Sequence, residues 1–349
     1  MNIALREHDP ARRLLPHDAL GRPLRDLRLS VIEACNFRCP YCMPADQVPD
    51  GHGLDATSRL SFDEIETLVR GFVRLGVNKL RLTGGEPLLR KRLPDLVARL
   101  ARIDGLHDIA LTTNGSLLAA QARALREAGL HRVTVSLDAL DPGVFRTLSG
   151  GRGDVADVLA GIQAAAAAGF APVKLNCVVQ RGVNDDQVLP LVEYARARGH
   201  VLRFIEYMDV GTCNGWRRER VLPSAELRDR IHARWPLRPL DPNYRGEVAV
   251  RYAFADDSGD GVGELGFVSS VSAPFCGDCH RARVSADGTL YTCLFAGEGR
   301  ALRPWLVQGE GALANEVAAL WSRRRDRYSE LRATAVSSRR KVEMFLVGG

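Results

Sequence analysis

The fold of this chain is indicated most directly by residues 27–42, whose sequence is LRLSVIEACNFRCPYC. The run Leu27–Glu33 is typical of a strand, and Cys35, Cys39 and Cys42 follow it with Cys-x3-Cys-x2-Cys spacing. These cysteines are therefore predicted to lie in a loop at the carboxyl end of a strand, where parallel α/β proteins assemble their active sites. Three thiolates leave one iron of a four-iron cluster open, whereas structural zinc usually takes four ligands. The spacing favours an iron–sulfur site with one position open to a small molecule.

Strand-like and helical patterns alternate from this stretch as far as residue 208. Further strands are predicted at Lys79–Thr83, Asp108–Thr113, Arg132–Leu137, Val173–Val179 and Val201–Tyr207. Helices are predicted from Ser61 to a stop at Gly76, and at Pro94–Ile103, Leu117–Ala128, Val155–Ala168 and Val188–Arg198. Ser61 and Glu64 have the spacing of a capping box. The alternation predicts parallel strands with right-handed crossovers, in an open doubly wound sheet or in a complete or partial barrel.

The alternation stops after Met208. One helix is predicted over Ser224–Arg234, and short strands are predicted over residues 265–299. A basic helix over Ala314–Arg332, with Arg323–Arg325 on a solvated face, and an extended end over Lys341–Gly349 complete the chain.

A second triple, Cys276, Cys279 and Cys293, has Cys-x2-Cys-x13-Cys spacing. One interpretation is a zinc knuckle with His280 as fourth ligand, although a histidine directly after a ligand cysteine suits a tetrahedral site poorly. The favoured interpretation is a second four-iron cluster whose open iron holds the substrate. Cys177 stands outside both triples, as does Cys213, and we interpret both as packed thiols.

Arg281 and Arg283 follow the second triple and lie on one face if the chain is extended there. Guanidinium groups suit bidentate phosphate binding, and Arg28 and Arg81 fall on predicted strands of the same sheet. Four arginines near one pocket suggest a polyphosphate, although ordinary surface arginines remain the alternative.

The chain has 349 residues and a formal net charge of +6, with 46% hydrophobic and 26% charged residues. This composition allows a sizeable core, and the charge suits an anionic ligand or nucleic acid. No apolar run approaches the roughly 18 residues of a membrane span, and residues 1–13 contain no apolar signal core, so the expected location is the cytoplasm. Aromatic residues make up only 6% and do not cluster with the arginines, which argues against a zinc-dependent nucleic-acid-binding protein.

The first triple, with Tyr41 directly before its last cysteine, resembles the signature of the radical S-adenosylmethionine superfamily. Thr83–Pro87, which alone would also fit a turn, resembles that family's Gly-Gly-Glu motif. The resemblance implies an α/β fold, a partial (βα)6 TIM-type barrel of parallel strands with a C-terminal extension carrying a second iron–sulfur cluster. It implies that the open iron binds S-adenosylmethionine, which is cleaved to a 5′-deoxyadenosyl radical. The implied cofactor-binding residues are Tyr41, Gly84, Gly85, Glu86, Ser136 and Met208.

From Leu27 to Gly349 the chain is similar to the GTP 3′,8-cyclase family of molybdenum cofactor biosynthesis, which are lyases with two [4Fe-4S] clusters. The resemblance implies that the radical abstracts the ribose C3′ hydrogen of GTP. The product would be (8S)-3′,8-cyclo-7,8-dihydroguanosine 5′-triphosphate. The implied catalytic residues are Arg28, Arg281 and Arg283, and the implied substrate contacts are Arg28, Arg81, Thr112, Lys174, Arg281, Ala282 and Arg283.

The same resemblance implies several partners. They are a flavodoxin- or ferredoxin-type electron donor and a downstream cyclic pyranopterin monophosphate synthase, with a homodimer as one option and with neither nucleic acid nor membrane. It also implies that the tail ending in Gly348 and Gly349 enters the active site. We expect three regions: a tail over residues 1–20, the barrel over 21–260, and an auxiliary-cluster and substrate-binding region over 261–349.

One alternative remains within the radical superfamily, a peptide-modifying maturase with an auxiliary cluster. Such enzymes are expected to carry more C-terminal cysteines than the three present here, enough to close the auxiliary cluster.

Overall fold

A computed structural model describes residues 15–348, except residues 52, 54, 56, 256–262 and 333–340. Its centre is one twelve-stranded sheet with the order β12-β11-β10-β1-β2-β3-β4-β5-β6-β9-β8-β7. Every pairing from β10 across to β9 is parallel, and the strands outside these two pair antiparallel.

The strands are β1 (Asp26–Ser30), β2 (Lys79–Thr83), β3 (Asp108–Thr113), β4 (Arg132–Ser136), β5 (Lys174–Val179), β6 (Val201–Glu206), β7 (Leu237–Leu240), β8 (Val250–Phe254), β9 (Glu264–Val268), β10 (Arg281–Val284), β11 (Thr289–Tyr291) and β12 (Arg300–Ala301). The α-helices are α1 (Phe62–Arg74), α2 (Leu93–Leu100), α3 (Ala122–Glu127), α4 (Pro142–Leu148), α5 (Val155–Ala165), α6 (Val188–Ala197), α7 (Ser224–His232), α8 (Arg303–Leu306), α9 (Glu310–Ser322), α10 (Tyr328–Leu331) and α11 (Met344–Val347).

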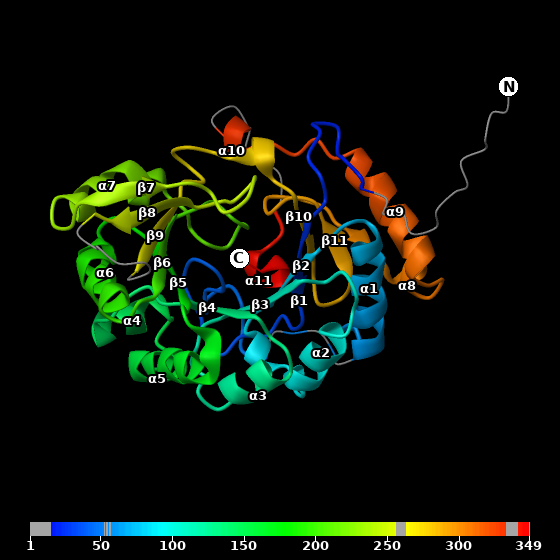
Figure 1. Ribbon diagram of the computed structural model, residues 1–349, viewed down its shortest axis with the longest axis horizontal. Helices are drawn as coiled ribbons and strands as arrows, with labels where there is room; N and C mark the ends of the chain where they lie inside the picture. Colours follow the sequence, from blue (N-terminus) through cyan, green and yellow to red (C-terminus); the bar gives the residue numbers. More distant parts are fainter. Residues whose placement is uncertain are drawn as a thin grey trace, which may run out of the picture.

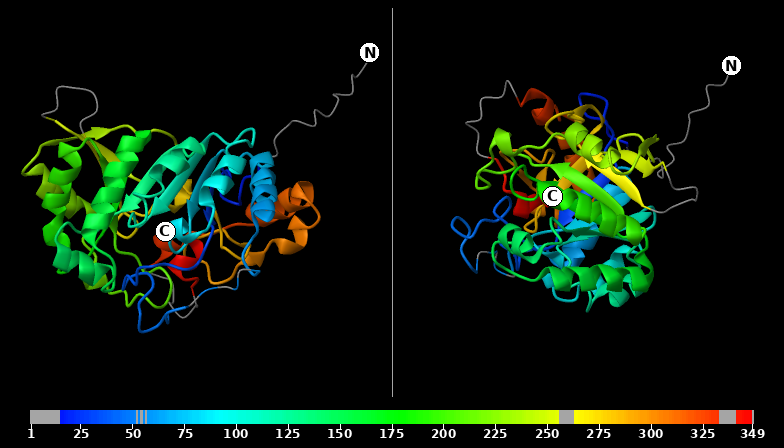
Figure 2. Two further views of the ribbon diagram at one scale, coloured as in Figure 1. Left: turned by 90° about the horizontal axis from the view of Figure 1, so that it is seen from below. Right: turned by 90° about the vertical axis from the view of Figure 1, so that its left-hand side faces the viewer.

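The six predicted strands are all present as β1–β6, in the predicted parallel order. Helices α1, α2, α3, α5 and α6 lie on the outer side of the sheet, while α11 lies on its inner side against β1 (Figure 1). The views in Figure 2 likewise place the C-terminal end within the body of the molecule. β10 and β9, both from the C-terminal third of the chain, extend the parallel sheet at its two sides. The predicted α/β fold, a sheet of parallel strands with a C-terminal extension, is confirmed.

Side chains alternate between the two faces of the sheet, with apolar side chains facing the helices and polar side chains facing the inner side. On β1, Leu27 and Leu29 face the helices and are fully buried, whereas Arg28 faces the inner side. β2 repeats this pattern with Leu80 and Leu82 outward. Each buried leucine contributes roughly 1.5–3 kcal/mol, so the outward face holds the helices and leaves the inner face available for polar groups.

Helix α1 begins as its sequence predicts. The Ser61 hydroxyl accepts from the Glu64 N–H over 3.1 Å, and the Ser61 N–H donates to the Glu64 carboxylate over 2.7 Å. Such a cap stabilises a helix by about 1 kcal/mol. Gly76, with φ of 92°, ends the helical path. Gly71 lets α9 approach closely, because a Cβ there would lie 2.8 Å from Leu313 Cδ2.

Three predictions for the C-terminal region and one for the barrel differ from the structure. The helix over Ala314–Arg332 is wrong, because α9 ends at Ser322 and the chain turns before α10. The prediction that Arg323–Arg325 lie on a solvated helix face is also wrong for Arg324, because its side chain is buried. The extended end instead contains the single turn α11, and Gly349 lies outside the described residues. Helix α4 was not predicted, although Asp141 caps it.

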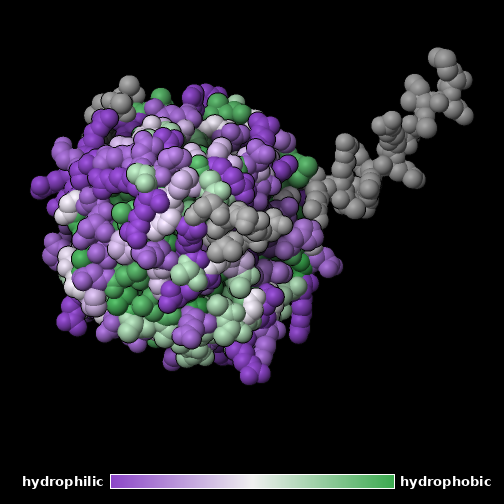
Figure 3. All heavy atoms as spheres, turned by 60° about the vertical axis from the view of Figure 1, so that its left-hand side comes forward, coloured by the Kyte–Doolittle hydropathy of each residue, from purple (hydrophilic) through white to green (hydrophobic). Residues whose placement is uncertain are grey.

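The remaining predictions for the fold concern the two single cysteines, the N-terminal tail and membrane spans. Cys177 and Cys213 are both buried and free, as predicted. Of the N-terminal tail, residues 1–14 lie outside the described part of the chain. Among the described helices, none is sufficiently long and apolar to cross a bilayer. Polar and charged side chains cover most of the face in Figure 3.

Candidate active site

The first cysteine triple lies in the loop after β1, as predicted. The Cys42 N–H donates to the Cys39 carbonyl over 2.9 Å, which turns the loop tightly. Burial raises the pKa of Cys35 to about 11, and burial together with the neighbouring thiols also raises the pKa values of Cys39 and Cys42. Metal binding displaces the thiol protons, so three cysteines carried by one tight loop fit an iron–sulfur cluster whatever their pKa values in the iron-free chain.

Gly84 and Gly85 bring the end of β2 against this loop. The Gly85 N–H donates to the Ile32 carbonyl over 2.8 Å. A Cβ at Gly84 would lie 2.2 Å from the Ile32 oxygen, and one at Gly85 would lie 2.2 Å from the Ala34 oxygen. The two glycines therefore position the residue before Cys35, in addition to the cofactor contact that the family resemblance implies.

Glu86 is fully enclosed between two strand ends. Its carboxylate accepts from the Asn114 N–H and the Thr113 hydroxyl, each over 2.7 Å, and from the Leu88 N–H over 3.0 Å. Burial raises its pKa to about 7. Asn114 also points its amide toward Cys35 Sγ, 3.9 Å away. Glu86 thus ties the third strand to the cysteine loop.

The remaining predicted cofactor residues follow the inner side of the sheet. The Tyr41 hydroxyl donates to Asp138 over 2.5 Å. Burial raises the pKa of Asp138 to about 6. Ser136 pairs in register with Asn176 of β5, and Met208 lines an inner cavity.

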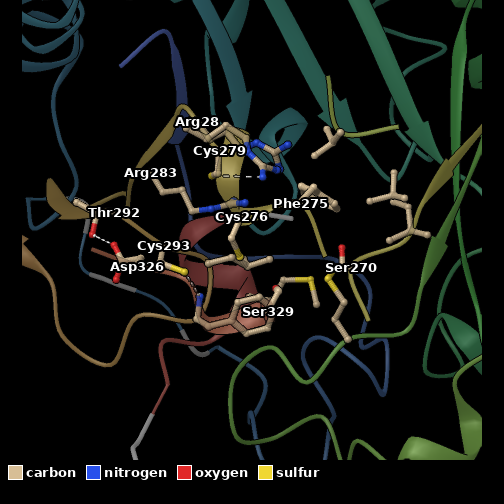
Figure 4. Close-up of a pocket in the computed structure, with 18 of the residues that line it drawn as sticks. Arg28, Ser270, Phe275, Cys276, Cys279, Arg283, Thr292, Cys293, Asp326 and Ser329 are labelled. Carbon is tan, nitrogen blue, oxygen red and sulfur yellow. Dashed lines mark hydrogen bonds between the residues drawn. The ribbon is translucent and has the colours of Figure 1, made fainter. Parts of the chain in front are cut away.

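The second triple lines this inner cavity, where Cys276, Cys279 and Cys293 project toward the same space as Arg28 and Arg283 (Figure 4). The other lining residues are Arg81, Thr112, Asn176, Arg203, Ile205, Met208, Val248, Val268, Ser270, Phe275, Arg281, Thr292, Leu294, Phe295, Arg324, Asp326, Ser329 and Met344.

The thiols of the second triple differ in their ionisation. Burial opposes ionisation of Cys279, but Arg281 and Arg324 outweigh it and lower its pKa to about 6. Burial raises the pKa of Cys293 to about 11. A preformed cationic environment around Cys279 suits a thiolate ligand, so this donor set also fits a cluster.

Neither triple is arranged as a site for one zinc ion. No three His, Cys, Asp or Glu side chains of the described residues are grouped closely enough to hold a single metal ion. A four-iron cluster presents its irons at separate corners, so its ligands need not converge on one point. His280 lies away from the cavity, with its ring against Tyr244 at a centroid distance of 6.1 Å. The zinc interpretation with His280 as fourth ligand is not supported.

Three arginines form a row across neighbouring strands. Arg28 of β1 stands in register with Arg283 of β10 on one side and with Arg81 of β2 on the other. Burial and Arg281 lower the pKa of Arg283 to about 10, and burial and Arg283 lower the pKa of Arg28. Adjacent buried cations are costly unless an anion compensates them, so the row indicates a site for a polyanion.

This arginine row lies between the two triples along the strand direction. Cys35 follows the carboxyl end of β1, whereas Cys279 precedes the amino end of β10, which runs parallel to β1. A molecule bound at the row therefore has one cysteine triple toward each end of the strands.

Two predicted substrate residues lie elsewhere. Lys174, at the amino end of β5, lines a second cavity with Lys79 and Arg132. Burial and Arg203 lower its pKa to about 8. The two cavities share Arg81 and Arg203 in their linings. The Ala282 side chain faces the hydrophobic core, so only its backbone is available to a ligand.

Sequence reasoning missed two cationic residues of the cavity. Arg203 was detectable, because it is the only charged residue of the run Val201–Ile205 and pairs in register with Asn176. Arg324 carries no local signal, because it reaches the cavity only through the turn after α9.

The C-terminal segment enters the cavity, as the resemblance implies. Met344 lines it, and Arg283 donates to the carbonyls of Val347 and Gly348. A side chain at Gly348, where φ is 64°, would lie 2.1 Å from Thr83 Cγ2. A residue other than glycine would therefore not fit this close approach.

Asp209 anchors the beginning of the same segment. Its carboxylate accepts from the Tyr328 hydroxyl over 2.5 Å, from Arg332 Nε over 2.9 Å and from Lys341 Nζ over 2.7 Å. The Lys341 ammonium also lies 4.5 Å from the centre of the Tyr328 ring. The residue directly after Met208 therefore holds the tail in place.

Comparison with known proteins agrees with this arrangement. The Radical SAM superfamily model matches residues 29–195, and the Molybdenum Cofactor Synthesis C model matches residues 200–330. A protein from Xanthomonas campestris pv. campestris (strain 8004), named GTP 3′,8-cyclase, is 70% identical over 95% of this chain and 97% of its own length. A protein of the same name from Acidothermus cellulolyticus is 51% identical, over 95% of this chain and 98% of its own length.

Solved structures share the fold at low identity. Streptococcus suis SuiB bound to S-adenosylmethionine aligns with a TM-score of 0.56 and 15% identity, over 77% of this chain and 60% of its own. Native anSMEcpe with bound AdoMet aligns with a TM-score of 0.55 and 15% identity, over 92% and 93%. At this identity the likeness concerns the fold alone.

Proposed function

The chain belongs to the radical S-adenosylmethionine family of GTP 3′,8-cyclases, and we propose that its inner cavity binds GTP between two iron–sulfur clusters. The reaction joins C3′ of the ribose to C8 of the base in molybdenum cofactor biosynthesis. The alternative of a peptide-modifying maturase is not supported, because the extensively identical relatives carry the cyclase name.

The first triple would hold the cluster that binds S-adenosylmethionine and supplies its one-electron reductive cleavage. Within this site, Gly84 and Gly85 fix the loop before Cys35, and Glu86 fixes the neighbouring strand end. Tyr41, held by its hydrogen bond to Asp138, would contact the cofactor beside the loop. Ser136 and Met208 would complete the contacts to the cofactor.

The second triple would hold the cluster that binds the guanine base, and the arginine row would bind the triphosphate. The row Arg283, Arg28 and Arg81 is the observation that supports this assignment most strongly, because it concentrates buried positive charge beside the second triple. Arg203 connects this row to the second cavity, where Lys174 would reach the phosphates farthest from the base. Thr112, which accepts from Arg81 over 2.9 Å, would orient that arginine toward the ligand.

Binding of GTP and of guanosine to the cluster-loaded chain, measured by calorimetry, tests this proposal. We expect Arg28→Ala to weaken GTP binding by about tenfold or more, the scale of a lost charge-assisted contact, and to leave guanosine binding nearly unchanged. Arg123→Ala, which removes an exposed arginine that pairs with Glu127, is the control. Equal loss for both ligands would contradict assignment of the row to the phosphates. Reconstituted chain should carry about eight irons, as two four-iron clusters require.

We also propose the division into a tail over residues 1–20, a barrel over 21–260 and a substrate region over 261–349. The second triple, Arg281, Arg283 and the C-terminal segment all belong to the last region. Expression of the intact chain beside one ending at residue 260 tests it. If residues 21–260 fold without β9 and β10, the shorter chain retains iron at the first triple, which would support the division. Loss of that iron would contradict it.

For the partners, we propose a flavodoxin- or ferredoxin-type electron donor, which suits the net charge of +6 because such carriers are acidic. We propose cyclic pyranopterin monophosphate synthase as the consumer of the product, a cytoplasmic location and a homodimer. Light scattering of the cluster-loaded chain tests the dimer, and turnover with each reduced carrier in place of dithionite tests the donor. A monomer in light scattering would contradict the proposed homodimer. Turnover with dithionite and with neither reduced carrier would contradict the proposed donor.

A further inference from the structure

We propose that Arg324 is a positioning residue that holds Cys279 as a ligand of the second cluster and raises the reduction potential of that cluster. The inference rests on the proposed assignment of Cys276, Cys279 and Cys293 as ligands. It concerns a residue that reaches the site only through the tertiary fold.

The Arg324 guanidinium is directed at both polar groups of Cys279. Its Nη1 donates to the Cys279 carbonyl over 2.7 Å, and its Nη2 donates to the Cys279 sulfur over 3.2 Å. The guanidinium carbon lies 4.5 Å from the centre of the Trp321 ring, and the side chain is only 1% exposed. Two donors in a fixed planar fork orient the cysteine more firmly than a single ammonium would.

A buried ion network behind the cavity holds Arg324. Asp18 accepts from Arg324 Nη1 over 3.2 Å and from Arg22 Nε over 2.6 Å. Arg22 Nη1 in turn donates to the carbonyls of Cys276 and Asp326, over 2.7 and 2.8 Å. The network thus holds the backbone of two cysteines of the second triple, Cys276 through Arg22 and Cys279 through Arg324.

The fully buried part of this network carries more positive than negative charge without an anion at Cys279. Among the described residues, Asp18 is the only fully buried carboxylate that pairs with Arg22 and Arg324. Asp326 lies 3.4 Å from Arg324 Nε, and its side chain is 34% exposed. A buried cation is costly unless it is paired, and a cluster thiolate at Cys279 supplies the missing negative charge. Arg281 Nη2 approaches the same sulfur, 3.4 Å away.

Such a pairing has a redox consequence. Reduction adds negative charge to a cluster, so cations and N–H donors at the sulfur stabilise the reduced state. Among the described residues, the sulfurs of Cys35, Cys39 and Cys42 accept no hydrogen bond from an arginine. Their donors are the Phe37 N–H and the Asn114 amide, both directed at Cys35. The second cluster should therefore have the higher potential of the two.

The test uses the full chain with Cys35, Cys39 and Cys42 replaced by alanine, so that only the second triple can bind iron. Its midpoint potential is measured by redox titration monitored by electron paramagnetic resonance. We expect Arg324→Gln to weaken the reduced state relative to the oxidised state about tenfold, which is a fall of about 59 mV for one electron. Arg324→Lys should give a smaller fall, and Arg323→Gln, at the exposed neighbouring arginine, should give none.

An unchanged potential in Arg324→Gln at full iron content would overturn the inference. If Arg324→Gln does not fold, Arg324→Lys tests the inference, because it keeps the positive charge and loses the planar pair of N–H donors. An unchanged midpoint potential in Arg324→Lys would again overturn the inference. A parent chain without iron, where about four per chain are expected, would instead overturn the ligand assignment.

Discussion

Each cysteine triple contains one Cys-x2-Cys pair, and yet the two triples have different electrostatic surroundings. The sulfur of Cys35 receives a backbone N–H and an amide, and burial keeps its pKa high. The sulfur of Cys279 receives two arginine side chains, and its pKa is low. The difference shows that cysteine spacing indicates a cluster, while the surrounding charges indicate what the cluster is suited to bind. Cations beside the second triple suit a polyphosphate substrate, whereas the first triple has both a cation, Arg38, and a carboxylate, Glu86, near Cys35, which suits a zwitterionic cofactor.

Removing one ligand from each triple gives the largest effect and tests whether the triples have separate roles. Cys39→Ala should abolish cleavage of S-adenosylmethionine, because the cluster proposed at the first triple is the proposed site of cleavage. Cys279→Ala should retain cleavage and lose the cyclised product. Iron content and 5′-deoxyadenosine formation, measured for both variants, check this. Identical losses in the two variants would show that the triples act as one site.

Gly85→Ala tests whether the first triple depends on backbone packing rather than on charge. The added Cβ would lie 2.2 Å from the Ala34 carbonyl oxygen, so the loop carrying Cys35 must move. We expect a loss of about 1–3 kcal/mol in the free energy of unfolding and weaker iron binding at the first triple only.

Gly311→Ala in α9 is the matched control, because a Cβ there meets nothing within 4 Å. It should be neutral or stabilise the chain by up to about 1 kcal/mol. Denaturant unfolding and iron analysis of both variants provide the measurement. Normal iron content in Gly85→Ala would contradict the positioning role of that glycine.

The pH dependence of thiol alkylation in the iron-free chain compares the triples directly. Cys279, with a pKa of about 6, should be largely thiolate at pH 7.5, and its reactivity should fall as the pH drops through 6. Cys35 and Cys293, with pKa values of about 11, should react only as the pH approaches that value. Mass spectrometry of alkylated peptides gives the order, and Cys35 reacting first would reverse the comparison.

Ionisation of these thiols also affects stability with opposite signs. The lowered pKa of Cys279 contributes stability that is fully present above its unfolded value near 9 and is lost as the pH falls through 6. The raised pKa of Cys35 contributes stability below 9 that is lost as the pH rises toward 11.

A smaller effect is expected at the tail, which connects the two regions. Its Val342 N–H donates to the Ala296 carbonyl beside the second triple, and Glu343 accepts from Thr212 and from Cys213, whose side chain packs beside Cys42. Asp209→Asn weakens the anchor and should speed hydrogen exchange at Val342 about tenfold, with exchange in α1 unchanged. Glu226→Gln, an exposed carboxylate paired with two arginines, is the control. Unchanged exchange at Val342 would show that the tail is held without Asp209.

Local patterns were sufficient for most of the barrel. β2 and β3 have the predicted bounds, because strand alternation and flanking turns are properties of neighbouring residues. The capping box of Ser61 is local in the same sense. The predicted helix over Ala314–Arg332 failed for the opposite reason, because the turn after Ser322 is stabilised by Arg324 pairing with Asp18, about 300 residues away in the chain.

The sequence alone therefore determined the two triples, the parallel strands and the arginines on them, since spacing and period two are encoded within a few residues. The tertiary structure decided which groups meet. It brings β10 beside β1, so that Arg283, Arg28 and Arg81 form one row, and it places Lys174 in a second cavity. It also directs Arg324 to Cys279. These contacts depend on the order of the strands in the sheet and on the burial of charge, neither of which is specified by a local sequence pattern.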